Sequence, residues 1–272
     1  MFAFGLTEPN AGTDVPGLTT TAVKDGDDYI INGKKHYISN GGNADIIVVY
    51  AKTDPAAGSR GISAFIVERD TPGLRIGEGD DKLGIRAART YELFFEDCRI
   101  PAKNRVGDEG EGFKLAMEVI DRGRLGVAAM AVGIARAALD EALKYSKERL
   151  VANKTIAEFQ GIQFMLAEMN VDVELAQTYT YYAASLKDKK GYRLSKKAST
   201  AKLFASEASN RVVQKAIQIH GGNGYMKKYP IERIYRDQRI LEIFEGTSQV
   251  QKIVIAQAML KPIKQVQEGI RV

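Results

Sequence analysis

One segment near the C-terminal end of the chain places a carboxylate within an apolar run. Glu245 follows Ile243 and Phe244, and it precedes Gly246 and Thr247. A carboxylate that its neighbours shield from water has a raised pKa and is a stronger base. Gly246 would let a ligand approach the backbone, and Thr247 can cap the helix that follows. The segment predicts a general base, with an ordinary acid in the first turn of a helix as the alternative.

A polar loop follows a short apolar strand at the start of the sequence. It reads Leu6-Thr-Glu-Pro-Asn-Ala-Gly-Thr-Asp14, with hydroxyl groups on both sides of Gly12. Gly12 is free to adopt a positive φ, and such a loop offers backbone N–H groups and hydroxyls to the oxygens and ring nitrogens of a ligand. A simple turn is the alternative interpretation.

A third segment, Lys35-His-Tyr-Ile-Ser-Asn-Gly-Gly42, combines an aromatic residue with a hydroxyl group. Tyr37 and Ser39 are two residues apart, so in a strand both side chains project from one face. An aromatic plane beside a hydroxyl suits stacking on a flat heterocycle and hydrogen bonding to its edge. A half-buried hairpin strand would show the same pattern.

Two further features have weaker links to chemistry. The run Gln218-Ile-His-Gly-Gly-Asn-Gly224 closes a predicted helix with a glycine cluster that a ligand could approach. His220 lies in this run without a nucleophile to pair with it, so a structural hydrogen-bonding role is expected. Asp121 and Arg124 are spaced i, i+3 in a predicted helix, the usual spacing of an intrahelical ion pair.

The elements that must position these residues differ between the two parts of the chain. Before Gly107, short β-rich runs at residues 28–33, 45–50, 61–67 and 90–95 alternate with turn residues. No segment of helix length separates these runs, which excludes a parallel βαβ sheet. The pattern predicts an antiparallel β-barrel or sandwich over residues 1–108.

From residue 109 the apolar residues recur with a helical period. Val127, Met130, Ile134 and Ala138 define one helix, and residues 162–173 define a second. A third helix, from about Ser195 to Ile219, carries alanines at 198, 201, 205 and 208, and a fourth follows Thr247. Four helices with short connections predict an antiparallel four-helix bundle over residues 109–272. The fold class is therefore a multi-domain α+β protein.

Composition excludes several classes of protein. The 272 residues include 39 basic and 34 acidic side chains, which give a net charge of +5. The single cysteine, Cys98, cannot form an internal disulfide, and two histidines do not suffice for a zinc site of the Cys/His type, so no metal site is expected. The longest apolar stretch, residues 126–135, is about half of what a membrane span needs. The sequence contains no signal peptide, dinucleotide fingerprint or P-loop, and nothing in it predicts nucleic-acid binding.

The segments above are far more specific in combination than singly. They occur in order with these sequences: Thr7-Glu-Pro-Asn-Ala-Gly-Thr-Asp14, Asn32-Gly-Lys-Lys-His-Tyr-Ile-Ser-Asn-Gly-Gly42, Lys82-Leu-Gly-Ile-Arg86, Gln218-Ile-His-Gly-Gly-Asn-Gly224, Tyr235-Arg-Asp237 and Phe244-Glu-Gly-Thr-Ser-Gln249. In this combination the sequence resembles the acyl-CoA dehydrogenase family over essentially its whole length, and it is most similar to the short-chain (butyryl-CoA) members.

The resemblance implies an FAD-dependent oxidation of a short- to medium-chain acyl-CoA to the trans-2-enoyl-CoA, a step of fatty-acid β-oxidation. Glu245 would remove the α-proton while hydride leaves the β-carbon for flavin N5. In the family, the backbone N–H of this glutamate and a ribityl hydroxyl of FAD stabilise the thioester oxygen. Some relatives carry the base on the first long helix instead, at the position of Gly123. A glycine at that position and a glutamate at 245 place this chain with the majority type.

The resemblance also assigns binding residues. Tyr37 would stand over the isoalloxazine ring with Ser39 near its N5 edge, and Arg149, Gln160 and the run from Gln218 to Gly222 would reach FAD across a subunit interface. The residues implied for FAD are Phe4, Leu6, Thr7, Gly12, Thr13, Tyr37, Ile38, Ser39, Arg149, Gln160, Gln218, Ile219, Gly221, Gly222, Thr247 and Gln249. The residues implied for the acyl-CoA are Thr13, Asp121, Arg124 and Gly246.

Three departures from the family pattern bear on these expectations. Tyr37 replaces the tryptophan that is common at the stacking position. The run Leu150-Val-Ala-Asn153 replaces the usual Lys-x-Phe-Gly after Arg149. The N-terminal helical domain of the family, which walls the acyl pocket, is lacking ahead of the Leu6 loop.

The resemblance implies partners as well. These are an acyl-CoA substrate, an electron-transferring flavoprotein as electron acceptor, and further copies of the chain in a homodimer or homotetramer. The expected location is the cytoplasm, or the mitochondrial matrix in a eukaryote. An alternative is a truncated, non-catalytic subunit or fragment that binds partners without turnover. An oxidase or an enoyl-CoA reductase using the same residues is a further alternative.

Overall fold

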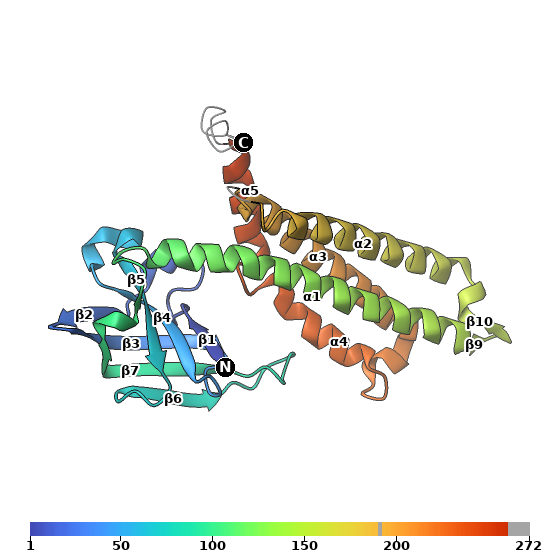
Figure 1. Cartoon of the computed structure of the whole chain (residues 1–272). Helices are drawn as coiled ribbons and strands as arrows, with labels where there is room; N and C mark the ends of the chain where they lie inside the picture. Colours follow the sequence, from blue (N-terminus) through green and yellow to red (C-terminus); the bar gives the residue numbers. More distant parts are fainter. Residues whose placement is uncertain (190–191, 261–272) are drawn as a thin grey trace. The chain divides into compact units, whose positions relative to one another are not determined.

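The computed structural model describes residues 1–189 and 192–260, which form two compact units, one within residues 1–119 and the other from Ile120 onward (Figure 1). The first unit is a β-sheet unit and the second is helical, which confirms the predicted α+β class. The predicted boundary at 108/109 precedes the first long helix, which begins at Gly112. None of the helices in the described ranges is long and apolar enough to cross a membrane.

The first unit contains one sheet of eight strands. Their order is β6-β7-β3-β2-β4-β5-β8, and β1 pairs with β4. The strands are β1 (Phe2–Gly5), β2 (Thr21–Asp25), β3 (Asp28–Ser39), β4 (Ile46–Lys52), β5 (Ile62–Glu68), β6 (Leu74–Gly79), β7 (Thr90–Pro101) and β8 (Arg105–Val106). Most pairs are antiparallel as predicted, but β1 and β2 each pair with β4 in parallel. Parallel pairing of β1 was not expected, because its partner lies more than 40 residues away in the sequence.

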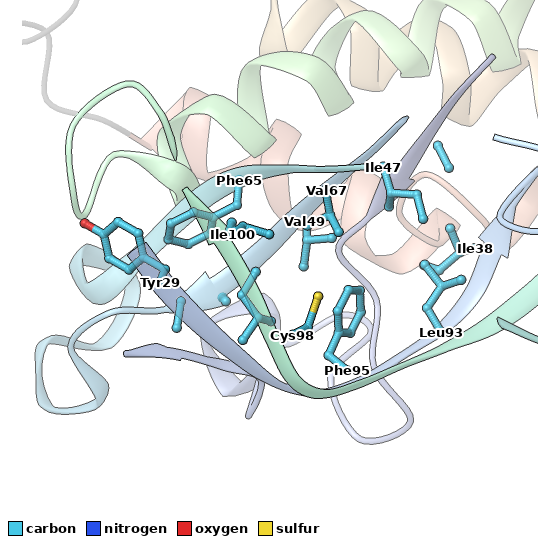
Figure 2. Close-up of a cluster of buried hydrophobic side chains, with 14 of the residues drawn as sticks. Tyr29, Ile38, Ile47, Val49, Phe65, Val67, Leu93, Phe95, Cys98 and Ile100 are labelled. Atoms are coloured by element: carbon cyan, nitrogen blue, oxygen red, sulfur yellow. The ribbon is translucent and has the colours of Figure 1, made fainter. Parts of the chain in front are cut away.

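Alternating side chains of the strands form the core of this unit. Figure 2 shows Ile38 and Leu93 at one end of the cluster and Tyr29 at the other, with Cys98 beside Phe95. Because alternate residues of a strand face opposite sides of the sheet, Ile38 lies in the core while its neighbours in sequence are exposed to varying degrees. Burial raises the pKa of the Cys98 thiol to about 11, so this cysteine behaves as an apolar core residue.

The second unit is built from long helices. They are α1 (Gly112–Glu148), α2 (Gln160–Ser185), α3 (Ser195–His220), α4 (Ile231–Gln238) and α5 (Ser248–Leu260). A hairpin of β9 (Leu150–Val151) and β10 (Lys154–Thr155) connects α1 to α2. Residues of α1, α2 and α3 share one buried cluster, so these helices pack side by side (Figure 1). The short helix α4 was not predicted, whereas the four longer helices were.

The alanines predicted on the third helix are all buried. Ala198, Ala201, Ala205 and Ala208 lie in a cluster with Leu125 and other residues of α1 and with residues of α2. A side chain that is no larger than a methyl group allows helices to approach closely. The stripe therefore brings α3 against α1 near residue 125, where the acidic and basic residues of the site are found.

We expect Ala205→Leu to lower the free energy of unfolding by about 1–3 kcal/mol, because the added atoms overfill a core position that is only 1% exposed. Urea denaturation followed by circular dichroism measures this change. Ala129→Leu on the exposed face of α1 is the control and should change the free energy of unfolding by less than about 0.5 kcal/mol. Equal urea midpoints for Ala205→Leu and the unchanged chain would contradict close packing at α3.

Candidate active site

Glu245 lies on a tight turn that precedes α5. Its φ is +53° and that of Gly246 is +88°, so two consecutive residues are left-handed. A side chain other than glycine in this conformation costs about 1 kcal/mol or more, and it persists where surrounding contacts impose it. Glu245 is three residues ahead of Ser248, where α5 begins. The alternative of an ordinary acid in the first helical turn is therefore wrong.

The Glu245 side chain packs against α1 at a glycine. A Cβ atom built on Gly123 would lie 2.8 Å from Glu245 Oε2, a separation that real Cβ atoms essentially never show. Ile243 is 46% exposed, so it does not provide the shielding that the sequence suggested. Gly123 and Arg124 on α1 lie at the carboxylate instead, and Lys202 on α3 is close enough to act on it electrostatically. The carboxylate thus lies beside Gly123, the α1 position at which the resemblance implies a base in some relatives.

Burial and charge act on Glu245 in opposite directions. Removal from water raises the pKa of the Glu245 carboxyl above its usual value, while the positive charges of Arg124 and Lys202 lower it. The net direction is upward, so desolvation prevails. Burial also lowers the pKa of Arg124, and it lowers that of Lys202 to about 8. The arrangement gives a carboxylate that is more basic than one in water.

Side-chain donors hold the carbonyl groups of this turn. Lys202 Nζ donates to the Gly246 carbonyl oxygen at 2.8 Å. Gln251 Nε2 donates to the same oxygen at 2.8 Å and to the Glu245 carbonyl oxygen at 3.1 Å. Thr247 Oγ1 accepts from the Val250 N–H at 3.3 Å, which confirms the predicted cap of α5. Lys202 and Gln251 were not predicted, although both contribute to the site.

Asp121 and Arg124 form the expected intrahelical pair. Arg124 Nη1 donates to Asp121 Oδ1 at 2.6 Å, and the arginine side chain is 7% exposed. Ser195 Oγ, at the start of α3, donates to Asp121 Oδ2. Because Arg124 also lies close to Glu245, the pair connects the carboxylate turn to the start of α3.

A second group of predicted residues lines a cavity at the far end of α3. The cavity has a volume of 490 Å³. Arg149, Ile219, Gly221 and Gly222 lie in its wall, and Gln160 and Gln218 do not. Its lining consists of Tyr145, Arg149, Val151, Ile156, Ile219, His220, Gly221, Gly222, Asn223 and Met226. One cation, exposed glycine backbone and an amide group are suitable partners for an anionic ligand.

His220 occupies a structural position beside this cavity, as expected. Its Nδ1 donates to the Ala216 carbonyl oxygen at 2.8 Å, and its ring stacks on Tyr145 with 4.3 Å between centroids. His220 Nε2 is buried and has no hydrogen-bond partner among the residues that the structure describes. α3 ends at His220, and Gly221 follows with a φ of +57°, so the glycine cluster terminates the helix as predicted.

The departure after Arg149 is a tight hairpin. Ala152 and Asn153 both have positive φ, at +50° and +63°, as the two central residues of a type I′ turn require. β9 and β10 flank them, and Val151 reaches the cavity wall next to Arg149. Arg149 therefore lines the cavity even though the run Leu150-Val-Ala-Asn153 departs from the family pattern.

In the first unit, the loop that follows β1 is fixed by a buried ion pair. Lys35 Nζ and Glu8 Oε1 are 2.8 Å apart, and the two side chains are 0% and 2% exposed. Glu8 also accepts hydrogen bonds from the N–H groups of Thr19 and Thr20, and Lys35 donates to the Leu6 carbonyl oxygen at 3.2 Å. Burial alone would raise the pKa of Glu8, but Lys35 and these donors lower it to about 2. Sequence analysis missed this pair.

The other residues predicted for the cofactor surround this loop or adjoin it. The His36 N–H donates to the Thr7 carbonyl oxygen at 2.8 Å, so β3 holds the loop beside its own last residues. Tyr37 is 64% exposed, and Ser39 is also exposed, while Ile38 is buried between them. A bulge between Lys35 and Ile38 accompanies the positive φ of Tyr37.

Besides Thr7, four residues of the same predicted set lie in β1 and the loop. Phe4 packs against Tyr50 with 5.1 Å between ring centroids, and Leu6 is buried. Gly12 and Thr13 are exposed, and Gly12 does not have the positive φ that its residue type allows. In the second unit, Gln249 is exposed in the first turn of α5. Gly12 and Thr13 are thus accessible to a ligand, while the start of the loop is anchored in the sheet.

The chain matches known proteins over both units. Residues 3–98 match the family model for the acyl-CoA dehydrogenase middle domain, and residues 110–260 match the model for the C-terminal domain. The chain is 49% identical over 259 residues to the caffeyl-CoA reductase-Etf complex subunit CarC of Acetobacterium woodii, covering 95% of this chain and 68% of that protein. It is 50% identical over 254 residues to the short-chain specific acyl-CoA dehydrogenase of Clostridium acetobutylicum, covering 93% and 67%.

A solved structure shows the same fold. The butyryl-CoA dehydrogenase of Megasphaera elsdenii superimposes with a TM-score of 0.94 at 48% identity, covering 96% of this chain and 68% of that one. The two matched domain models and the shared fold define the class of the chain, which is that of the flavin-dependent oxidoreductases acting on acyl-CoA thioesters. The chain belongs to the acyl-CoA dehydrogenase family, whose members are FAD-dependent enzymes of fatty-acid β-oxidation. It spans about two thirds of the length of these relatives.

We expect Glu8→Gln to lower the free energy of unfolding by about 3–5 kcal/mol at pH 7, because Lys35 is left as a buried charge without its partner. The pKa of Glu8 is lowered from 4.5 to about 2 on folding. The stability it contributes is therefore complete above pH 4.5 and is lost as the pH falls toward 2. Chemical denaturation at several pH values measures both effects.

Asp14→Asn, an exposed change in the same loop, is the control for Glu8→Gln. Asp14→Asn should unfold like the unchanged chain at neutral pH. It should also lose stability on acidification to the same extent as the unchanged chain. If Glu8→Gln unfolds at the same denaturant concentration as the control, the buried pair does not stabilise the loop.

Proposed function

We propose that this chain carries the catalytic machinery for α,β-dehydrogenation of a short- to medium-chain acyl-CoA, with Glu245 as the base that removes the α-proton. The observation that carries the proposal is the partly buried carboxylate of Glu245, which lies on a left-handed turn and has a pKa raised by desolvation. The α-proton of a thioester is weakly acidic, so a carboxylate with an ordinary pKa is a poor match for it. Burial brings the pKa of the base closer to the working pH.

The backbone of the same turn supports stabilisation of the thioester oxygen. Among the residues that the structure describes, none accepts a hydrogen bond from the Glu245 N–H. A free N–H group that is fixed in direction is a suitable donor to an oxygen that becomes negative in the transition state. The left-handed conformation of Glu245 fixes this direction. One residue therefore supplies both the base and an oxyanion donor.

The residues proposed for FAD fit its chemical groups within each unit. Arg149 and the exposed glycines Gly221 and Gly222 at the 490 Å³ cavity suit a diphosphate. Tyr37 offers an exposed aromatic face, and Ser39 an exposed hydroxyl, to the flavin ring. FAD, when bound, supplies the acceptor for the hydride that leaves the β-carbon. Thr13, Asp121, Arg124 and Gly246 remain our proposal for contacts with the acyl-CoA.

The relatives favour a second direction for the same site. CarC is a subunit of a caffeyl-CoA reductase-Etf complex, and reduction of an enoyl-CoA is the reverse of dehydrogenation. In that direction protonated Glu245 would deliver the proton to the α-carbon. We propose an electron-transferring flavoprotein as the electron partner in either direction. We also propose a cytoplasmic location, which the single buried and free cysteine supports.

An apolar stripe on α2 supports assembly of the chain with further copies of itself. Phe164, Val171, Leu175 and Tyr182 are 59%, 55%, 54% and 47% exposed and are spaced by 7, 4 and 7 residues, which places them on one face of the helix. The opposite face is buried and includes Met169 and Val173. An exposed stripe of this kind suits a symmetric interface. We propose a homodimer or homotetramer that uses this face.

Glu245→Gln should retain bound FAD but slow flavin bleaching by butyryl-CoA by about 10³-fold or more, because the amide cannot accept the α-proton. Anaerobic titration followed by the flavin absorbance spectrum measures both properties. Repeating the titration with octanoyl- and isobutyryl-CoA ranks the acyl chains. Glu174→Gln on the exposed face of α2 is the matched control and should bleach at the unchanged rate. Undiminished bleaching by Glu245→Gln would refute the assignment of the base.

Val171→Glu together with Leu175→Glu should reduce the molar mass in solution, because charges in an apolar interface lose their hydration without gaining partners. Light scattering coupled to size-exclusion chromatography gives the mass. Val23→Glu, at an exposed position of β2, is the control and should leave the mass unchanged. A double variant that keeps the mass of the unchanged oligomer would exclude the α2 stripe as the interface.

A further inference from the structure

A buried lysine on α3 is not used by the proposed mechanism. Lys202 lies one residue after Ala201 on the helix face that also carries Ala198 and Ala205, and its side chain is completely buried. A lysine side chain is rarely buried unless it is paired. Its Nζ donates to the carbonyl oxygen of Gly246, which is the residue after the proposed base. The hydrogen bond of this fully buried cation is therefore made to a single backbone oxygen, in the turn that carries Glu245.

Charged groups from three segments act on Lys202. Arg124 of α1 repels it, and Glu242, Glu245 and Glu207 attract it. Two of these carboxylates have other partners, because Glu242 Oε2 lies 3.2 Å from Arg239 Nη1 and Glu207 Oε1 lies 3.5 Å from Lys252 Nζ. Glu245 has no such ion-pair partner within 4 Å among the described residues. From α5, the neutral Gln251 donates to the same Gly246 oxygen.

We propose that Lys202 is a positioning residue for Glu245, which fixes the Glu245–Gly246 turn through the Gly246 carbonyl and supplies the buried positive charge that keeps the carboxylate ionised. This inference rests on the proposed role of Glu245 as the base. A neutral donor such as Gln251 can hold the turn, but only a cation can also stabilise the carboxylate. Lys202 and Gln251 donate to the same oxygen, so variants of each can separate the effect of the charge from the effect of the hydrogen bond.

The directions of the pKa shifts agree with a role of Lys202 in stabilising the carboxylate, in addition to holding the turn. Burial lowers the pKa of Lys202 to about 8, so the ammonium group remains mostly protonated at pH 7. The charges of Arg124 and Lys202 in turn limit the rise that burial imposes on the pKa of Glu245. Without Lys202, the base would be protonated over a wider pH range and would be inactive there.

Lys202→Met removes both the donor and the charge, and Lys202→Gln removes the charge but keeps an N–H donor on a side chain that is one bond shorter. Gln251→Leu is the matched control, because it removes neutral hydrogen bonds from the same oxygen and from the Glu245 carbonyl oxygen without removing a charge. Glutamate side chains labelled with ¹³C report the titration of Glu245 by NMR, and its signal is assigned by its loss in Glu245→Gln. We expect both Lys202 variants to raise the pKa of Glu245 by about one unit or more, and Gln251→Leu to leave it within a few tenths of a unit.

One measurement needs no variant of Lys202. In the unchanged chain, the Glu245 signal should shift a second time near pH 8, when Lys202 loses its proton. Absence of this second shift, or an unchanged pKa of Glu245 in the folded Lys202 variants, would overturn the proposal. Because these titrations need no turnover, they test Lys202 even if the chain does not catalyse dehydrogenation.

Flavin bleaching by butyryl-CoA separates failure of this inference from failure of the proposed function. If Glu245 is the base, Lys202→Gln should bleach about tenfold more slowly below the raised pKa and should recover as the pH increases, since one unit of pKa is a tenfold change in the ionised fraction. A uniformly slower rate at every pH would indicate a merely structural lysine and would contradict the proposal. Bleaching that does not depend on Glu245 would refute the proposed function and leave the titration result for Lys202 intact.

Discussion

A carboxylate in a protein interior is a useful base only when the loss of hydration is nearly balanced by nearby positive charge. If burial acts alone, the carboxyl remains protonated, and if a cation is too close, the carboxylate loses its basicity. At Glu245 the balance is set by Arg124 from α1 and Lys202 from α3, and the net pKa is raised. The helices must therefore converge on one turn. The alanine face of α3 and the glycine at 123 are the packing conditions for that convergence.

Glu8 and Glu245 show how geometry decides whether burial or nearby positive charge prevails in setting the pKa of a carboxyl group. Glu8 lies 2.8 Å from Lys35 and accepts two backbone N–H groups, and its pKa falls to about 2. Glu245 forms no direct ion pair within 4 Å among the described residues, because Lys202 donates to a backbone oxygen and Arg124 to Asp121. Its pKa is raised. Direct pairing gives a structural anchor, whereas cations that are bonded elsewhere leave a carboxylate free to accept a proton.

The spacing of apolar residues and the residue types predicted most of the fold. The elements that were not predicted have physical explanations. Helices were found wherever apolar residues repeated every three or four positions, but α4 has too few turns to show this repeat. The parallel pairing of β1 with β4 joins residues far apart in sequence, which local patterns do not record. In the site, Glu245 and the Asp121–Arg124 pair were predicted, while no role was predicted for Lys202 or Lys35.

The positions of these lysines did contain a signal. Lys202 falls on the buried alanine face of its helix, and Lys35 shares the strand parity of Tyr29 and Ile31. A cation on an apolar face needs a buried partner, and the only means of finding that partner was the folded chain. Ile243 shows the opposite error, since its apolar type suggested shielding of Glu245 and its side chain is 46% exposed.

The proposed acid–base role of Glu245 is the same for oxidation and for reduction. A base that removes a proton in one direction must return it in the other, through the same transition state and with the same oxyanion donor. Similarity to a protein named as a dehydrogenase and to a subunit of a reductase complex is therefore compatible with one arrangement of Glu245, Arg124 and Lys202. In the proposed mechanism these residues govern how readily the α-proton moves, whereas the electron partner governs which way the reaction runs. The direction must consequently be encoded where the flavin exchanges electrons, outside the carboxylate turn.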